Sequence, residues 1–253
     1  MIQRIPGIVV RTVIETRSVS FFATTDQDTI MGQNAWGYFY EPEELAMIGR
    51  HFTPGGTFLD VGANIGNHTI YAALFLRARQ VIPIEPNPDA IQILQINIDL
   101  NRLHSIVDTA YLGYGLAERK ERAAIGRTIQ WNLGGTTLVR DPAGAIPLAT
   151  GDELLDDRPV EFIKVDVEGM ELQVLSGLTR TIERYRPNLF VEVDNAHQAE
   201  FLKWAEVMGY GVAETYNRYG SQENFGGADE VIKASCRLMR TDGCWWRSFR
   251  SYR

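Results

Sequence analysis

Short apolar runs alternate with segments of helical periodicity from Thr57 onward. The runs predicted as strands are TFLDV, VIPIE, part of SIVDTAYL, EFIKVDV, NLFVEV and GVAETY. The predicted helices lie between these runs, with apolar stripes at Ile70, Ala73 and Leu74, at Ile91, Leu94 and Ile98, at Met170, Val174 and Leu178, and at Phe201, Leu202, Ala205 and Met208. This alternation predicts an α/β fold with a mostly parallel sheet and helices on both faces.

Three stretches depart from this alternation. Residues 1–54 lack it, although RTVIETRSVSFFAT predicts a pair of strands and EELAMIGRHF a short helix. Residues 113–158 carry turn signals between short alternating runs, which is typical of a hairpin excursion. Pro83 lies within VIPIE and has no N–H to donate to a neighbouring strand, which predicts a bulge or a shorter strand at that point.

Composition narrows the class of protein. The formal net charge of −7 disfavours nucleic acid as a partner, because such binding depends on basic residues. No apolar run reaches the ~20 residues needed to cross a bilayer, and Pro6, Gly7 and Arg11 interrupt the segment where a signal peptide would be apolar. Cys236 and Cys244 match no zinc spacing. We therefore expect a cytoplasmic protein that binds neither nucleic acid nor membrane, and the oligomeric state stays open.

The stretch FLDVGANIGNHT joins a strand to a helix through a turn that contains two glycines. A dinucleotide fingerprint would require glycine at the positions of Gly62, Asn64 and Asn67, so it fails at two of three. What remains is Asp60 at the strand end, Gly62 and Gly66 in the turn, and Glu85 at the end of the next predicted strand. A carboxylate at the position of Glu85 can accept hydrogen bonds from both ribose hydroxyls.

A site for a nucleoside without a pyrophosphate seat favours S-adenosylmethionine as the cofactor. Its sulfonium and amino groups would be attracted by the carboxylates of Asp60 and Asp166. An ordinary turn, in which the glycines only permit close packing, is the alternative at this point.

Taken in order, DVGANIG, IEPNPDAIQILQINIDLN, FIKVDVEGMELQVLSGL and RPNLFVEVD make the chain resemble the FkbM family of S-adenosylmethionine-dependent methyltransferases. The resemblance covers roughly residues 40–194. It implies a class I methyltransferase (Rossmann-like) fold, whose seven-stranded sheet has an antiparallel last strand, and VIKASCRLM is our candidate for that strand. It also implies methyl transfer to a hydroxyl oxygen of a sugar, a polyketide macrolide or another secondary metabolite.

The resemblance organises the chain into three parts. Residues 1–54 form an N-terminal extension or lid, residues 55–240 the methyltransferase domain, and residues 241–253 an aromatic and basic tail with no family counterpart. The predicted cofactor-binding residues are Asp60, Gly62, Ala63, Asn64, Gly66, Glu85, Pro86, Asn87 and Asp166. The tail could stack on a sugar, a base or a neighbouring subunit, or simply fray.

Transfer to an alcohol requires a general base within hydrogen-bond reach of the acceptor. Asp166 and Glu168 flank the end of the fourth clear strand, and Glu192 ends the next strand. We predict these three as catalytic, with Asp166 at the methionine end of the cofactor and Glu168 or Glu192 acting on the acceptor. A structural ion pair with Lys164, which lies on the same strand face, is the competing interpretation.

The predicted acceptor-binding residues are Tyr40, Glu41, Asn132 and His197. Tyr40 and Glu41 are assigned from family position as part of a lid, Asn132 from its place beside the pair Gly134-Gly135, and His197 from its place after the fifth strand. His68 is expected to cap or pack in its helix. No two histidines are spaced to share a metal, so we predict no metal site, although carboxylates alone leave Mg²⁺ open.

The sequence thus predicts an O-methyltransferase for a small hydroxylated acceptor. A binding or scaffold protein that keeps the cofactor without transfer is the alternative from another class. A nucleic-acid N-methyltransferase is a third possibility, disfavoured because VDVEGM stands where an NPPY-like stretch would be needed. A nicotinamide dehydrogenase is disfavoured by the missing glycines.

Overall fold

The computed structural model describes residues 5–129, 132–194, 196–217 and 233–240. Its central sheet has the strand order β11-β12-β10-β9-β3-β4. These strands are β3 (Thr57–Val61), β4 (Gln80–Ile84), β9 (Phe162–Val165), β10 (Asn188–Asp194), β11 (Tyr210–Asn217) and β12 (Lys233–Arg240). β4, β3, β9 and β10 pair in parallel, whereas β12 is antiparallel to both β10 and β11. The antiparallel strand predicted from VIKASCRLM is confirmed.

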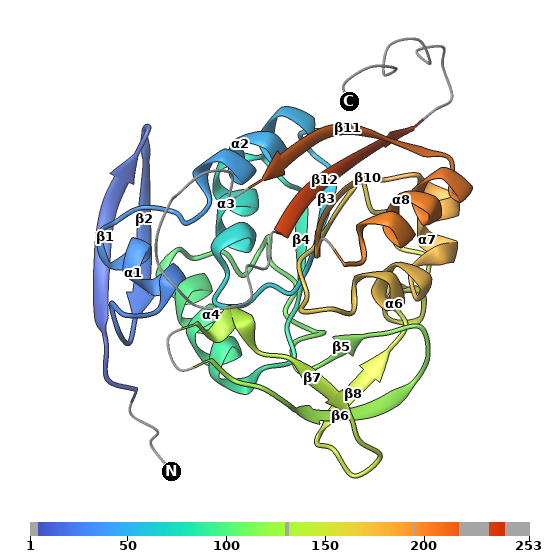
Figure 1. Ribbon diagram of the computed structural model, residues 1–253. Coiled ribbons are helices and arrows are strands. Elements are labelled where there is room, and N and C mark those ends of the chain that lie inside the picture. Colours follow the sequence, from blue (N-terminus) through green and yellow to red (C-terminus); the bar gives the residue numbers. More distant parts are fainter. Residues whose placement is uncertain (1–4, 130–131, 195, 218–232, 241–253) are drawn as a thin grey trace, which may run out of the picture.

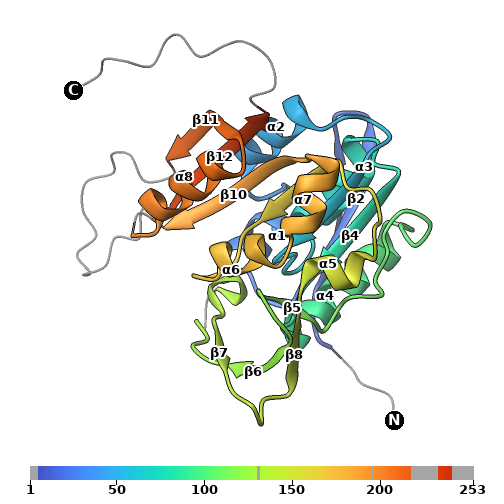
Figure 2. The same ribbon diagram turned by 90° about the vertical axis from the view of Figure 1, so that its right-hand side faces the viewer.

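Helices cover both faces of this sheet (Figures 1 and 2). Phe58, Phe162 and Phe190 pack on one face, in the cluster that also contains the buried side chains of α2, α3 and α4. The next residue of each strand packs on the other face, against α5, α6, α7 and α8. The bounds are α2 (Pro42–His51), α3 (Asn67–Phe75), α4 (Pro88–Leu100), α5 (Gly151–Leu155), α6 (Glu171–Ser176), α7 (Thr179–Tyr185) and α8 (Gln198–Val207). No described helix is both long and apolar enough to cross a bilayer.

The expected seven-stranded sheet is not found: within the described residues the central sheet has six strands. The strand predicted within SIVDTAYL does not form. This stretch lies along the outer edge of β4 and contributes only one parallel bridge, between Val81 and Val107. The backbone groups of Val81 face this outer side, since its N–H donates to Ile106 and its C=O accepts from Asp108. Pro83, two residues on, faces the same way but has no N–H to offer.

Pro83 therefore ends the sheet on this side without disturbing β4. The strand keeps a regular parallel register with β3, in which Pro83 lies opposite Asp60. The bulge or shortening expected at Pro83 is absent because its missing N–H points to the outer edge rather than toward β3.

The N-terminal segment forms a hairpin of β1 (Ile8–Ile14) and β2 (Arg17–Ala23), followed by α1 (Thr29–Ala35). The hairpin lies beside α4 (Figure 1). The side chain of Asn97 joins them, because its Oδ1 accepts from the N–H of Phe22 at 2.7 Å and its Nδ2 donates to the C=O of Ile65 at 2.9 Å. The strand pair predicted in residues 1–54 is confirmed by β1 and β2, and the short helix predicted from EELAMIGRHF is confirmed by α2. The role of a lid stays a prediction.

Residues 113–158 include a second, four-stranded sheet with the order β5-β8-β6-β7. Its strands are β5 (Gly115–Leu116), β6 (Glu121–Ile125), β7 (Leu138–Arg140) and β8 (Ile146–Ala149). This is the hairpin excursion predicted from the turn signals, and Figure 1 shows it below the central sheet. The predicted tail of residues 241–253 lies outside the described residues.

Candidate functional site

The turn after β3 brings backbone close to the end of β9. Gly62 has φ +76°, and a Cβ added there would lie 1.8 Å from the carbonyl oxygen of Asp166. Only glycine fits such a position. The N–H groups of Gly62 and Ala63 both donate to the C=O of Ile84, each at 3.0 Å, so the turn is fixed to the end of β4.

Glu85, directly after β4, is anchored by the backbone of two loops. Its Oε2 accepts from the N–H of Asn64 at 2.7 Å, and its Oε1 accepts from the N–H of Asn87 at 2.8 Å. Asn87 in turn caps α4 by accepting from the N–H of Asp89. Each carboxylate oxygen retains one further lone pair, so Glu85 can still accept two hydrogen bonds from a ligand.

Burial raises the pKa of Glu85 to about 7, against the opposing effect of the two backbone hydrogen bonds and the charge of Lys164. Between its ordinary value and about 7 the folded protein keeps a proton that the unfolded chain has released. The contribution of Glu85 to stability therefore falls as the pH rises through this window. Ionised Glu85 is costly in the unliganded protein, which is typical of functional groups.

Lys164 on β9 lies at the floor of the site and is 1% exposed. Its Nζ donates to the C=O of Gly62 at 2.8 Å and lies 3.3 Å from both Asp60 Oδ1 and Asp166 Oδ2. Burial alone would lower the pKa of Lys164, but Asp166 and Asp60, followed by Glu41 and Glu192, raise it above its ordinary value. Lys164 is therefore a fixed cation rather than a base.

A cleft opens at the carboxyl ends of β3, β4, β9 and β10, where ligands of parallel α/β sheets bind. It encloses about 1120 Å³ of space, including its open mouth. The acidic residues that line it are Glu41, Glu85, Asp166, Glu168 and Glu192, against the single lysine at position 164 among the described lining residues. The cleft therefore favours a ligand with cationic groups.

One wall of the cleft joins the start of α2 to the start of α3. The side chain of Asn67 bonds both backbone groups of Tyr40, with Oδ1 accepting from its N–H and Nδ2 donating to its C=O, each at 2.9 Å. This clamp places Glu41 beside His68, and Glu41 Oε2 lies 3.7 Å from His68 Nε2. Burial, followed by the charge of Lys164, lowers the pKa of His68.

A short loop closes the cleft on the side of the second sheet. Asn132 caps the 3₁₀ turn η1 (Leu133–Gly135) by accepting from the N–H of Gly134. Asp28 anchors the loop to α1, because its Oδ2 accepts from the N–H of Leu133 at 2.8 Å. The nearby Oδ1 of Asn64 is buried and has no hydrogen-bond partner in the described part of the chain. An orphaned acceptor in a cleft wall is suited to a ligand that donates hydrogen bonds.

The structure brings most of the predicted site residues together. The cleft is lined by the predicted residues Tyr40, Glu41, Gly62, Ala63, Asn64, Glu85, Pro86, Asn87, Asn132, Asp166, Glu168 and Glu192. Three predicted residues lie elsewhere. Asp60 is 0% exposed and supports Lys164 from beneath the floor, Gly66 immediately precedes α3, and His197 immediately precedes α8.

Sequence reasoning did not assign three features of the site. His68 was expected to cap or pack, yet it lines the cleft beside Glu41. Asn67 was considered only as a failed fingerprint position, although it clamps Tyr40. Asp28 was not singled out from the sequence, although it caps α1 through one carboxylate oxygen and anchors the loop of Asn132 through the other.

Comparison with known proteins adds a family and a fold. The profile of the Methyltransferase FkbM domain matches residues 60–221, which is more than half of the chain. The hexuronic acid methyltransferase AglP of Haloferax volcanii is 33% identical over 127 residues, which are 49% of this chain and 50% of that relative. The matched segment thus spans about half the length of the curated relative.

Two solved structures resemble the chain. The crystal structure of methyltransferase FkbM from Methylobacillus flagellatus KT aligns with a TM-score of 0.48 at 20% identity and covers 73% of this chain and 43% of that chain. The crystal structure of M. jannaschii tRNA m1G37 methyltransferase aligns with a TM-score of 0.52 at 11% identity and covers 92% of this chain and 54% of that chain. The second alignment shows a methyltransferase-like α/β fold.

Proposed function

Because the chain belongs to the FkbM methyltransferase family, we propose that it transfers a methyl group from S-adenosylmethionine to a hydroxyl group of a small acceptor. The observation that carries this proposal is the anchored carboxylate of Glu85, which faces the cleft with one free lone pair on each oxygen. A ribose presents two neighbouring hydroxyls, and such a carboxylate can accept one hydrogen bond from each of them.

The residues that line the cleft offer a partner for each part of this cofactor. Glu85 would accept from the ribose hydroxyls, and the turn of Gly62, Ala63 and Asn64 would follow the nucleoside. The carboxylate of Asp166, which also lines the cleft, would attract the ammonium and sulfonium groups. Lys164 would stay bound to Asp60 and Asp166 and so keep the floor rigid.

S-adenosylmethionine supplies a methyl group that is already activated by its positive sulfur. The protein then has to align the acceptor oxygen and remove its proton. Glu168 and Glu192 line the cleft, and Glu192 is buried near the end of β10. We assign Glu192 as the base that takes the hydroxyl proton and Glu168 as an acceptor-positioning residue.

A hydroxylated sugar is the acceptor class that we propose. The support is the relative named for its action on hexuronic acid, together with a cleft whose carboxylates can accept hydrogen bonds from several hydroxyls. Tyr40 and Asn132, which both line the cleft, would contact this acceptor.

The proposal is tested by binding and by transfer. Titration calorimetry should detect S-adenosylmethionine and S-adenosylhomocysteine, and labelled S-adenosylmethionine with a panel of sugars and glycans should yield a methylated hydroxyl. Glu192→Gln should keep cofactor affinity and lose most of the transfer. Cofactor binding without transfer to any acceptor would favour the scaffold alternative, and absence of cofactor binding would overturn both.

Cofactor affinity should depend on pH through Glu85. Its pKa of about 7 lies within the accessible range, and hydrogen bonds from ribose favour the ionised form. Binding below pH 7 must therefore expel a proton, and we expect affinity to fall by up to about tenfold for each pH unit below this value and to level off above it. Calorimetry from pH 5.5 to 8 in buffers of different ionisation heat measures the proton release, which Glu85→Gln should abolish.

A further inference from the structure

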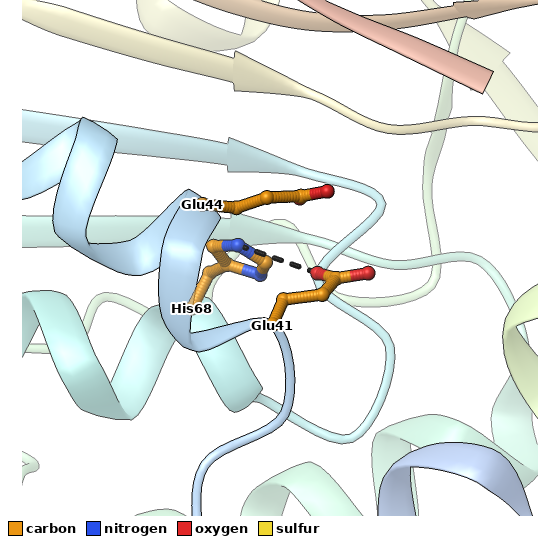
Figure 3. A group of neighbouring side chains, drawn as sticks. All are labelled: Glu41, Glu44 and His68. Atoms are coloured by element: carbon orange, nitrogen blue, oxygen red, sulfur yellow. Dashed lines mark ion pairs between the residues drawn. The ribbon is translucent and has the colours of Figure 1, made fainter. Parts of the chain in front are cut away.

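Three ligand-type side chains converge at the wall between α2 and α3. Glu41 immediately precedes α2, Glu44 lies in the first turn of α2, and His68 lies in the first turn of α3. One ligand atom from each lies within 4.8 Å of the other two. Figure 3 shows the imidazole lying between the two glutamate side chains. The three residues are 8%, 2% and 5% exposed, respectively.

The imidazole of His68 supplies an independent sign of a missing ligand. Among the residues that the structure describes, its Nε2 is buried without a hydrogen-bond partner. The nearest recorded charge is Glu41 Oε2 at 3.7 Å, too far for a hydrogen bond. A polar nitrogen that is nine-tenths buried normally has a partner.

The surrounding structure fixes the three residues in place. Asn67 clamps Tyr40 through two hydrogen bonds and thereby positions Glu41. Glu41 adopts φ +60°, a left-handed conformation that is unfavourable for a glutamate. Backbone strain of this kind clusters at functional sites, where surrounding structure imposes it. Glu44 follows three residues later on the same side of the helix.

We propose that Glu41, Glu44 and His68 bind one divalent transition-metal ion, Mn²⁺ or Zn²⁺. The nitrogen ligand disfavours Mg²⁺ and Ca²⁺, which take oxygen ligands, whereas imidazole with carboxylates suits Zn²⁺ and Mn²⁺. Ligand bonds of about 2.1 Å place neighbouring ligand atoms about 3–3.4 Å apart, so a small rotation of the two carboxylates closes the site.

The ion would have an open side toward the cleft. Glu41 and His68 line the cleft, whereas Glu44 does not, so the remaining coordination positions of the ion would be reached from the cleft. Three protein ligands with open positions are typical of catalytic rather than structural metal sites. The open positions suit hydroxyl or carboxylate oxygens of an acceptor. This role rests on the proposed function, whereas binding of the ion does not.

The test is binding of the metal alone to the full chain after treatment with a chelator. Calorimetry with Zn²⁺, and electron paramagnetic resonance of free Mn²⁺, should each give one ion per chain. Glu41→Gln, Glu44→Gln and His68→Gln should each weaken binding by about 100-fold or more. The control is Glu43→Gln, because Glu43 is an exposed neighbour on the same helix, and this variant should bind like the wild type.

Thermal unfolding with and without metal separates loss of the site from loss of the fold. Metal that binds the folded chain raises the melting temperature of the wild type and of Glu43→Gln, and it leaves the three ligand variants unchanged. Absence of a stoichiometric ion in the wild type would overturn the proposal, as would equal binding by all four variants. Titration of S-adenosylmethionine into the metal-free chain tests the proposed function separately.

Discussion

Replacing Glu85 with glutamine is expected to weaken binding of S-adenosylmethionine by about 10- to 100-fold. Two ribose hydroxyls would lose hydrogen bonds to a charged acceptor. The new amide also places its donors against the N–H of either Asn64 or Asn87, which now donate to opposite carboxylate oxygens at 2.7 Å and 2.8 Å. Calorimetric titration of wild type and variant measures the difference.

Two checks make this result specific to Glu85. Glu183→Gln, at an exposed position of α7, changes the chain by the same chemistry and should bind the cofactor like the wild type. The variant should also be no less stable than the wild type at pH 8, because it removes a buried carboxylate with an unfavourable ionisation. A Glu85→Gln chain that is folded and binds within threefold of the wild type would remove Glu85 from the cofactor site.

Replacing Lys164 with methionine is expected to lower the free energy of unfolding by about 3–5 kcal/mol. The variant keeps the volume of the side chain but leaves Asp60 buried without its cation. Asp60 is 0% exposed and otherwise keeps one hydrogen bond, from the hydroxyl of Thr69 at 2.6 Å. The C=O of Gly62 loses its Nζ donor as well. Urea unfolding followed by circular dichroism gives the change.

The matched control for this variant is Lys120→Met. Lys120 forms an exposed ion pair with Glu153 at 2.9 Å, so its loss should cost less than about 1 kcal/mol. A second variant, Lys164→Met with Asp60→Asn, should recover part of the lost stability because no buried charge is left alone. A loss below 1 kcal/mol in Lys164→Met would show that Asp60 does not depend on Lys164.

The features that sequence predicted best are local ones. Gly62 and Glu85 follow strands whose apolar runs are short and clear, and both line the cleft where their positions after β3 and β4 place them. The antiparallel β12 was predicted only through the family resemblance. Local pattern could not have given its partners, because β12 pairs with two strands that precede it in the chain.

The role of Asp60 shows where local reasoning fails. Its position at a strand end suggested contact with a cationic cofactor. In the sheet, Asp60 lies in register with Lys164, about 100 residues away in the chain, and this pairing turns the carboxylate into a buried support. Register between distant parallel strands depends on packing of the whole sheet, which no short motif encodes.

The cluster of Glu41, Glu44 and His68 was missed for a related reason. The usual sequence signal of a metal site is a pair of histidines at metal spacing, and the chain has no such pair. The third residue is brought in by a tertiary clamp, since Asn67 bonds Tyr40 across the boundary between α2 and α3. At Pro83 the sequence predicted a disturbance that the strand does not have, because sequence alone does not say which side of a strand lies at the sheet edge.

The position of β12 between β10 and β11 has a consequence for how the protein is made. When β10 has been synthesised, one of its edges can pair with β9. The partner of its other edge is β12 (residues 233–240), which is the last of the described strands to be synthesised. Until they arrive, β11 has no strand to pair with and β10 exposes a row of open backbone groups. The nascent chain therefore carries an unpaired strand edge from the synthesis of β10 until residues 233–240 follow, and this edge can pair with other chains during that interval.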